Sequence, residues 1–289
     1  MGFFSNLLHQ SQSVACVLPE THPVIRQISD AVGFDVVGAE GYASSLVPAI
    51  NSAAEYFDAQ IGTIPGPLDI SAAHYTHHPL VHALFSARQD IAHGIGRSVD
   101  VRQPLAFLAG AEQPESFALL GVRQQKDQAS DSPKQGFCEH TLRSLAATEA
   151  GARQGLRTAA LTRLVKRFSE HIDLLRKKGQ LPRDAWNIEN RRDLQSAEGD
   201  KGKLVLASEE LQADKLMRGL VAWLQRPTEQ LQVRAGNKAD AAQADPVESM
   251  SQLLCHDRRR WTVCMVRFPT AEGVAAVQNE ARQYRYIRI

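Results

Sequence analysis

The sequence has little of three things that usually narrow a function: aromatic residues, paired cysteines and long apolar runs. Aromatic residues make up 6% of the chain, and no motif groups them into a surface for stacking nucleic-acid bases. Cys16, Cys138, Cys255 and Cys264 have no paired spacing, so we expect reduced thiols and a cytoplasmic location. No basic residue precedes Arg26, which argues against a secretory signal. No segment approaches the roughly 18 unbroken apolar residues of a membrane span, so no span is expected.

Motifs that name a reaction are also missing. The Gly-Ile-Gly run at 94–96 has neither a preceding strand nor the third glycine of a dinucleotide-binding loop. In the Cys-His-Asp run at 255–257, neighbouring side chains of an extended chain point to opposite faces, so the histidine cannot serve the cysteine without a tight turn. The sequence therefore predicts no catalytic residue and no cofactor, and a non-enzymatic role is favoured.

Charge is balanced overall but unevenly distributed. The formal net charge of +1 gives no general attraction to nucleic acid or anionic membrane. In residues 1–100 the only basic side chains are Arg26, Arg88 and Arg97, whereas residues 141–192 are rich in lysine and arginine. We therefore expect the acidic first third and the basic later parts to attract each other within the fold or between subunits.

The first hundred residues are patterned as helices. Apolar residues recur at helical spacing from 20 to 32, followed by Gly33 as a C-cap, and again from 46 to 61. A third helix is predicted from Pro79, a residue preorganised for the first helical position, as far as about Ile95.

The strongest pattern in the chain lies at 148–178. Its apolar residues recur at spacings of three and four, which predicts one long helix with an apolar stripe formed by Leu161, Leu164, Val165, Phe168, Ile172 and Leu175. Gly179 is positioned to cap its end. A further helix is predicted from Ser208 to Leu224, with Pro227 as its stop.

Short apolar runs without a helical period predict strands. Residues 117–123 and 136–142 are typical of a hairpin with a long, polar, mobile loop. Residues 252–255 form another candidate, and 260–268 is apolar on both faces, as expected of a central strand. A helix from 270 to 281 and a final strand from 283 to 289 complete a strand-strand-helix-strand end of the chain.

These elements predict an α+β fold, in which a helical N-terminal part is followed by a small antiparallel or mixed sheet packed on the long central helix. We divide the chain into a mostly helical acidic region, 1–110, and an α+β region, 111–289. A single continuous domain is the alternative.

Four histidines lie close together in the sequence, and imidazole nitrogens are common ligands of zinc and related metals. They are His74, His77, His78 and His82. Pro79 disfavours helix at His78, so they would not share one helical face, and no Cys pair or HExxH pattern supports a site. Surface histidines at a helix start are the favoured interpretation, and a metal-dependent enzyme is a lesser alternative.

The long helix also carries a basic face that could contact phosphates. Its members are Arg157, Arg163, Lys166, Arg167, Lys177 and Lys178. No helix-turn-helix or zinc-finger motif accompanies them, so a solvated face, or one docked against the acidic first third, is favoured over a nucleic-acid interface.

The function predicted from these patterns is that of a non-enzymatic binding or assembly factor that interacts with protein. Self-association through the long helix or through a sheet edge is the favoured form. A nucleic-acid-associated protein that uses the basic face is the main alternative.

Overall fold

The computed structural model describes residues 23–33, 35–125, 136–189, 213–229, 231–236, 247, 250–255 and 260–284. The chain forms two compact units. Unit 1 comprises Met1–Glu55 and Thr162–Arg226, and unit 2 comprises Tyr56–Leu161 and Pro227–Ile289. Neither unit has a boundary at residue 110, and the division into 1–110 and 111–289 stays a prediction.

Helices make up most of the described chain. They are α1 (Pro23–Val32), α2 (Val47–Gly62), α3 (Pro79–Leu84), α4 (Arg88–Arg97), α5 (Val99–Gly110), α6 (Glu149–Glu189), α8 (Ala213–Leu224) and α9 (Thr270–Tyr284). Shorter helical turns are η2 (Tyr42–Leu46), η3 (His74–Thr76) and η4 (Pro227–Glu229). The strands are β1 (Leu68–Asp69), β2 (Glu115–Gln125), β3 (Gly136–Ala146), β4 (Leu231–Arg234), β5 (Ser251–Cys255) and β6 (Arg260–Pro269). Helices α2 and α6 each have residues in both units.

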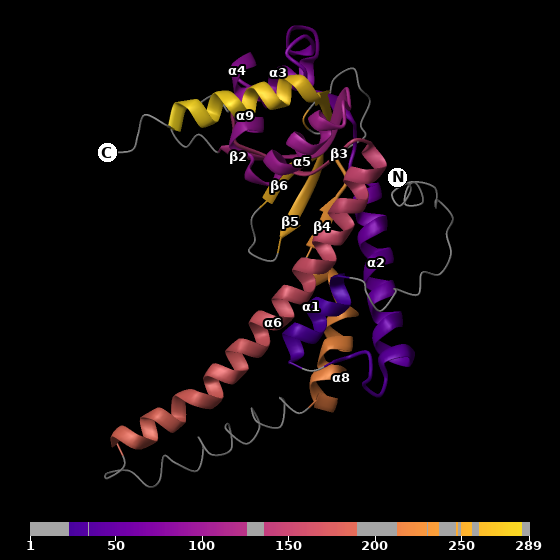
Figure 1. Ribbon diagram of the computed structural model, residues 1–289, viewed down its shortest axis with the longest axis vertical. Coiled ribbons are helices and arrows are strands. Elements are labelled where there is room, and N and C mark those ends of the chain that lie inside the picture. Colours follow the sequence, from indigo (N-terminus) through magenta and orange to yellow (C-terminus); the bar gives the residue numbers. More distant parts are fainter. Residues whose placement is uncertain are drawn as a thin grey trace. The chain divides into compact units, whose positions relative to one another are not determined.

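Unit 2 is built on one sheet with the strand order β3-β2-β6-β5-β4 (Figure 1). These strands pair antiparallel, and β1 adds to β6 in parallel, with Leu68 opposite Val266. The predicted α+β class is confirmed, and the sheet is of the mixed kind. The predicted central strand is also confirmed, because β6 has neighbours on both edges and its residues Val263–Val266 are all buried.

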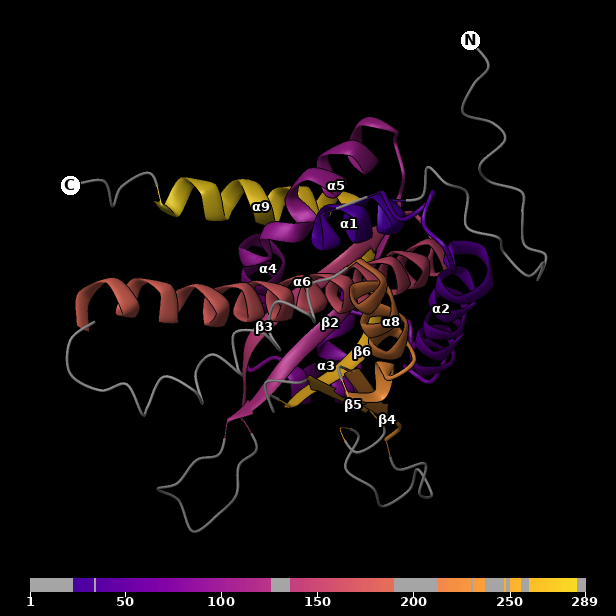
Figure 2. The ribbon, with the colours of Figure 1, turned by 90° about the horizontal axis from the view of Figure 1, so that it is seen from below.

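Both faces of this sheet are covered. One face carries Ala118, Leu120, Cys264, Val266 and Phe268, which pack with apolar residues of α3, α4, α5 and α9. Figures 1 and 2 both show α4, α5 and α9 grouped together in this unit. The other face carries Leu119, Val263 and Met265, which pack with Ala152 and Leu156 near the start of α6. The long helix therefore supplies part of the core of unit 2.

In unit 1 the apolar stripe of α6 is also buried. Leu164, Val165, Phe168 and Ile172 are each at most 4% exposed. The indole N–H of Trp223, on α8, donates to the carbonyl oxygen of Leu164 at 3.1 Å. The predicted stripe is therefore confirmed over these residues, and it belongs to the core of this chain rather than to a surface for a partner.

Two helix ends were predicted from glycines, one correctly and one not. Gly33 has a φ of 85°, and its N–H donates to the carbonyl of Ser29, so the predicted cap of α1 is confirmed. The prediction that α6 ends at Gly179 is wrong, because the helix continues to Glu189. A glycine inside a helix costs only about 1 kcal/mol relative to alanine, which the rest of a long helix can offset.

The predicted third helix is also wrong in its extent, because it is two helices. Phe85 leaves α3 with an extended backbone, at φ −123° and ψ 122°. The side chain of Asp90 then accepts the N–H of Ala87 at 2.8 Å and begins α4. The strand predicted at 283–289 lies outside the described residues, apart from Gln283 and Tyr284, which belong to α9. The loop predicted between β2 and β3 also lies outside them.

Candidate functional site

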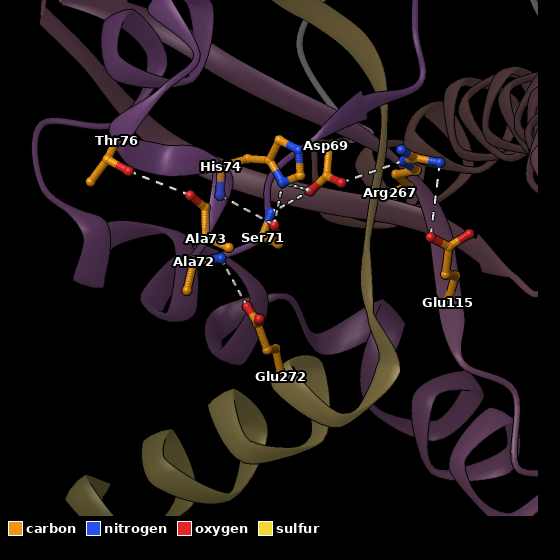
Figure 3. A network of polar contacts seen from close by, with 9 residues as sticks. All are labelled: Asp69, Ser71, Ala72, Ala73, His74, Thr76, Glu115, Arg267 and Glu272. Carbon is orange, nitrogen blue, oxygen red and sulfur yellow. Dashed lines mark hydrogen bonds and ion pairs between the residues drawn. The ribbon is translucent and has the colours of Figure 1, made fainter.

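The densest polar network in unit 2 lies just after β1, where the first of the predicted histidines is found (Figure 3). The backbone N–H of Ser71 donates to Asp69 Oδ1 at 2.9 Å. The Ser71 hydroxyl lies 2.9 Å from His74 Nδ1, and the same nitrogen lies 3.3 Å from Asp69 Oδ1. One carboxylate therefore holds both a serine and a histidine of the segment that follows it.

Neighbouring strands extend this network, because the ends of β1 and β6 and the start of β2 meet at the same end of the sheet. Arg267 of β6 lies between two carboxylates, with Nε 3.6 Å from Asp69 and a terminal nitrogen 3.8 Å from Glu115 of β2. The N–H of Ala72 donates to Glu272 in the first turn of α9 at 3.0 Å. Figure 3 shows the segment after β1 joined to Asp69 and to Glu272 of α9, while Arg267 of β6 links Asp69 to Glu115 of β2.

The surroundings of Asp69 favour its ionised form. Burial by itself would raise the pKa of this carboxyl group. The hydrogen bonds from Ser71 and the charges of His74 and Arg267 outweigh burial, so the net effect is a lowered pKa. Asp69 is therefore a charged anchor at neutral pH.

This arrangement does not form a nucleophilic triad. In such a triad the base meets the nucleophile through one ring nitrogen and the carboxylate through the other, whereas Ser71 and Asp69 both meet Nδ1 of His74. The serine is also only 5% exposed. The network is suited to ordering the segment that follows β1. The contacts of His74 with Ser71 and Asp69 both use Nδ1, and its side chain is half-exposed.

We expect Asp69→Asn to weaken unit 2 by about 1 kcal/mol at pH 7, because the amide keeps the acceptor for Ser71 but loses the charge that attracts Arg267. The lowered pKa means that this stabilisation is present above the ordinary carboxyl value of 3.8 and is lost as the pH falls below it. Urea unfolding at pH 7 and pH 3 measures the effect. Glu112→Gln, which neutralises an exposed carboxylate between α5 and β2 in the same unit, is the control. An equal effect of both variants would contradict the prediction.

The remaining predicted histidines are not brought together. The ring of His82 packs against that of Tyr75, with centroids 4.3 Å apart and the ring planes tilted by 36°. His78 precedes α3 in an extended conformation, and its Nδ1 is buried without a hydrogen-bond partner. His77 is exposed. No group of three or more His, Cys, Asp or Glu residues among the described residues is placed to hold a metal ion, so the metal-site hypothesis finds no ligand set there.

The basic residues of α6 divide into paired and exposed side chains. Arg157 forms an ion pair with Asp58 of α2 at 2.9 Å. Arg163 and Arg167 lie 3.8 and 3.7 Å from Glu170. Lys166 and Lys177 are exposed, whereas the side chain of Lys178 lies outside the described part of the chain. A nucleic-acid interface on this face stays a prediction.

The predicted attraction between the acidic first third and the basic later parts is confirmed within unit 2. Acidic residues from the first hundred pair with arginines from the later chain in Asp58–Arg157, Asp69–Arg267 and Asp100–Arg143. These pairs join α2 to α6, β1 to β6, and α5 to β3. The acidic and basic parts of the chain therefore form ion pairs between elements of unit 2.

Sequence reasoning missed a second ionic cluster between α4 and α9. The carboxylate of Glu280 is 3% exposed and lies 3.2 Å from His93 Nδ1 and 3.1 Å from Arg97 Nε. Burial would raise the pKa of Glu280, but the hydrogen bonds from His93 and Arg97 and their charges lower it overall. The signal in the sequence was the spacing of His93 and Arg97, which places both on one side of a helix.

A shallow pocket of about 370 Å³ opens in unit 1 between α2 and α8. Its lining residues are small or uncharged: Ser44, Ser45, Pro48, Ala49, Ser52, Val221 and Gln225. No charged side chain is among them, so the pocket offers no ionic partner to a phosphate, a carboxylate or an amine.

Sequence reasoning also missed an exposed apolar face on α5. Val99 is 70% exposed and Phe107 is 75% exposed, whereas Val101, Leu105 and Leu108 of the same helix are buried. The inner residues recur at helical spacing, and the two exposed residues fall outside that stripe. A helical interpretation of 99–110 would therefore have found this face.

None of the helices in the described part of the chain is long and apolar enough to cross a membrane. Comparison with known proteins found no match to a family model, to a curated protein or to a solved structure.

Proposed function

We propose that this protein is a non-enzymatic binding and assembly factor that contacts protein through α5. One observation carries the proposal: Val99 and Phe107 are 70% and 75% exposed on the same helix. Single apolar side chains on a surface are ordinary, but these two lie two turns apart on one side of the same helix. Phenylalanine is also enriched at the centres of protein interfaces, where its burial contributes a large apolar area.

Both edge strands of the sheet are contacted by side chains of the chain itself. At the edge strand β3, the N–H of Leu142 donates to the hydroxyl of Ser98 at 2.8 Å. At the opposite edge strand, β4, Tyr56 donates to the carbonyl of Leu231 at 3.0 Å, and Gln60 accepts the N–H of Val233 at 2.8 Å. An added strand would have to displace these side chains, so the proposal assigns docking to α5.

We expect a photoreactive phenylalanine analogue at position 107 to form an adduct with protein when the full chain is expressed in cells. The analogue replaces an exposed ring, so the fold should be retained. A matched analogue at Gln278, exposed on α9, should give little adduct. Val99→Ser should reduce the yield at 107, because it removes the apolar neighbour of the docking face.

Denaturing gels and mass spectrometry of the adducts measure this result. Protein adducts at position 107 that exceed those at position 278 and that depend on Val99 support the proposal. An absence of protein adducts at position 107, or equal adducts at both positions, would show that α5 is not a docking face.

A further inference from the structure

We infer that the ionic cluster between α4 and α9 is a binding site for a phosphate group, either free phosphate or a phosphate monoester. The carboxylate of Glu280 is 3% exposed, whereas the side chains of His93 and Arg97 above it are 39% and 64% exposed. The buried carboxylate orients the two exposed side chains, and these two side chains are the groups that meet the ligand. The site is separate from the docking face of α5, so it goes beyond the proposed function.

The carboxylate determines which nitrogen of His93 faces the ligand. Glu280 Oε2 lies 3.2 Å from His93 Nδ1. Burial raises the pKa of Glu280, but the hydrogen bonds from His93 and Arg97 and their charges lower it overall, so the carboxylate is ionised and can only accept a hydrogen bond. Nδ1 therefore carries the proton. Nε2 makes no hydrogen bond to any described residue and is left for a ligand.

Arg97 is held by the same carboxylate. Its Nε donates to Glu280 Oε1 at 3.1 Å. Its two terminal nitrogens make no hydrogen bond within the described part of the chain, and such a pair of nitrogens can bind two oxygens of one anion. His93 and Arg97 are four residues apart, so both project from one side of α4. Together they offer three nitrogen atoms to a ligand on that side.

Gly96 allows the carboxylate to reach this position. An added Cβ at Gly96 would lie 2.8 Å from the carbonyl oxygen of Ala276 and 2.9 Å from Cβ of Glu280. Glycine therefore lets α9 approach α4 closely at the turn from which Glu280 projects. The Gly-Ile-Gly run at 94–96 is not a dinucleotide-binding loop, and its second glycine serves this packing of the two helices.

The charges around the cluster favour an anion. The guanidinium group of Arg102 donates to the carbonyl of Gly96 at 3.1 and 3.3 Å, which places a second guanidinium charge beside Arg97. The N–H and the hydroxyl group of Ser98 each donate to a further carbonyl at this end of α4, so these carbonyls are occupied. Asp90 lies in the first turn of α4, at the opposite end of the helix. Two guanidinium groups therefore outweigh the one buried carboxylate.

Phosphate fits these donors better than a carboxylate does. The oxygens of a phosphate group are tetrahedral, so two can meet the terminal nitrogens of Arg97 while a third meets His93. A carboxylate has two oxygens, and Arg97 alone would occupy both. The ring of His93 suits phosphate in either protonation state, because Nε2 donates when the ring is charged and accepts from a P–OH group when it is neutral. The site is exposed, so we expect a dissociation constant on the order of 1 mM for inorganic phosphate.

Titration of the full chain with inorganic phosphate, followed by NMR at constant ionic strength, tests this inference. The backbone amide signals of residues 93–98 should shift and saturate with a dissociation constant on the order of 1 mM. Chloride and acetate at the same ionic strength should not produce these shifts. Glycerol phosphate distinguishes the two sources of the group: tighter binding than inorganic phosphate indicates a monoester ligand, and equal binding indicates that free phosphate is sufficient.

Two variants assign the binding to the cluster while keeping a partner for Glu280. Arg97→Lys keeps a positive charge but removes the paired terminal nitrogens, so it should raise the dissociation constant by roughly fivefold or more. His93→Gln keeps an N–H donor but removes Nε2, and it should raise the dissociation constant by about threefold. Arg88→Lys, exposed at the other end of α4, is the matched control and should leave the affinity unchanged.

Circular dichroism checks that each variant is folded, and the titration of the wild type tests the site without any variant. A wild type whose signals do not saturate with phosphate, or shift equally with chloride or acetate, would overturn the inference. A folded Arg97→Lys variant that binds phosphate as tightly as Arg88→Lys would also overturn it, because the cluster would then be an ion pair between helices and nothing more.

Discussion

Replacing Gly66 by alanine is expected to destabilise unit 2 by about 3–5 kcal/mol, which is the largest loss of stability among the substitutions that we predict. Gly66 has a φ of 121°, a conformation that side chains with a Cβ rarely adopt. An added Cβ would also overlap the backbone carbonyl of Met265 on the central strand β6. Backbone cannot rotate away as a flexible side chain could, so the segment itself must shift.

That shift would break the contacts that hold this segment to the sheet. The N–H of Met265 donates to the carbonyl of Pro65 at 2.8 Å, and β1 pairs with β6 from Leu68 onward. Gly62→Ala is the matched control, since its added Cβ would meet nothing within 4 Å at the end of α2. We expect it to be neutral or slightly stabilising, because alanine restricts the unfolded chain.

Urea unfolding monitored by circular dichroism, together with hydrogen exchange of β6 amides, measures both variants. A Gly66→Ala protein as stable as Gly62→Ala would show that the segment before β1 is not held against β6 as described. Faster exchange confined to β1 and β6 would support the stated cause.

The second large effect is expected from His93→Ala combined with Arg97→Ala. The two changes leave the carboxylate of Glu280, which is 3% exposed, without the side chains that now neutralise it. The removed side chains are themselves partly exposed, so water can reach the carboxylate in the variant, and we expect a loss of about 1–2 kcal/mol at pH 7. Arg282→Ala, exposed on the same helix as Glu280, should change stability by less than about 0.5 kcal/mol.

The dependence on pH distinguishes this cause from lost packing. In the wild type the pKa of Glu280 is lowered, so the cluster stabilises above the ordinary value of 4.5 and ceases to do so as the pH falls below it. In the double variant the unpaired carboxyl group should have a raised pKa, and protonation should relieve its cost as the pH falls. The difference between wild type and variant should therefore shrink from pH 7 to pH 4. A difference that is constant over this range would indicate lost packing alone.

The sequence predicted elements correctly where a single pattern of apolar residues extends over many positions. The stripe of α6 repeats over several turns, and β6 is apolar on both faces because it lies between two covered sides of the sheet. Gly33 and Pro79 were interpreted correctly because glycine readily adopts the positive φ of a helix cap, whereas the fixed φ of proline suits the first turn of a helix. These features need no knowledge of distant residues.

The parts that were missed depend on distant residues or on very short elements. Strand β1 has two residues, too few for an alternating pattern, yet its pairing with β6 is what brings Asp69 to Arg267. The pairing of His93 with Glu280 joins residues 187 positions apart and exists only after α4 packs on α9. The break after α3 occurs at Phe85, an apolar residue that is buried in the core and therefore continues the helical pattern.

The place of β6 in the chain has a consequence for how the protein is made. During synthesis β2 and β3 leave the ribosome well before β6, the strand that pairs with β2 along most of its length. Until then the edge of β2 that β6 later occupies is an open template, although the helices α3, α4 and α5 and the start of α6 have already been made. Unit 2 should therefore fold slowly and late, because its central contacts join distant residues. The nascent chain should be a substrate for chaperones that hold exposed apolar strands.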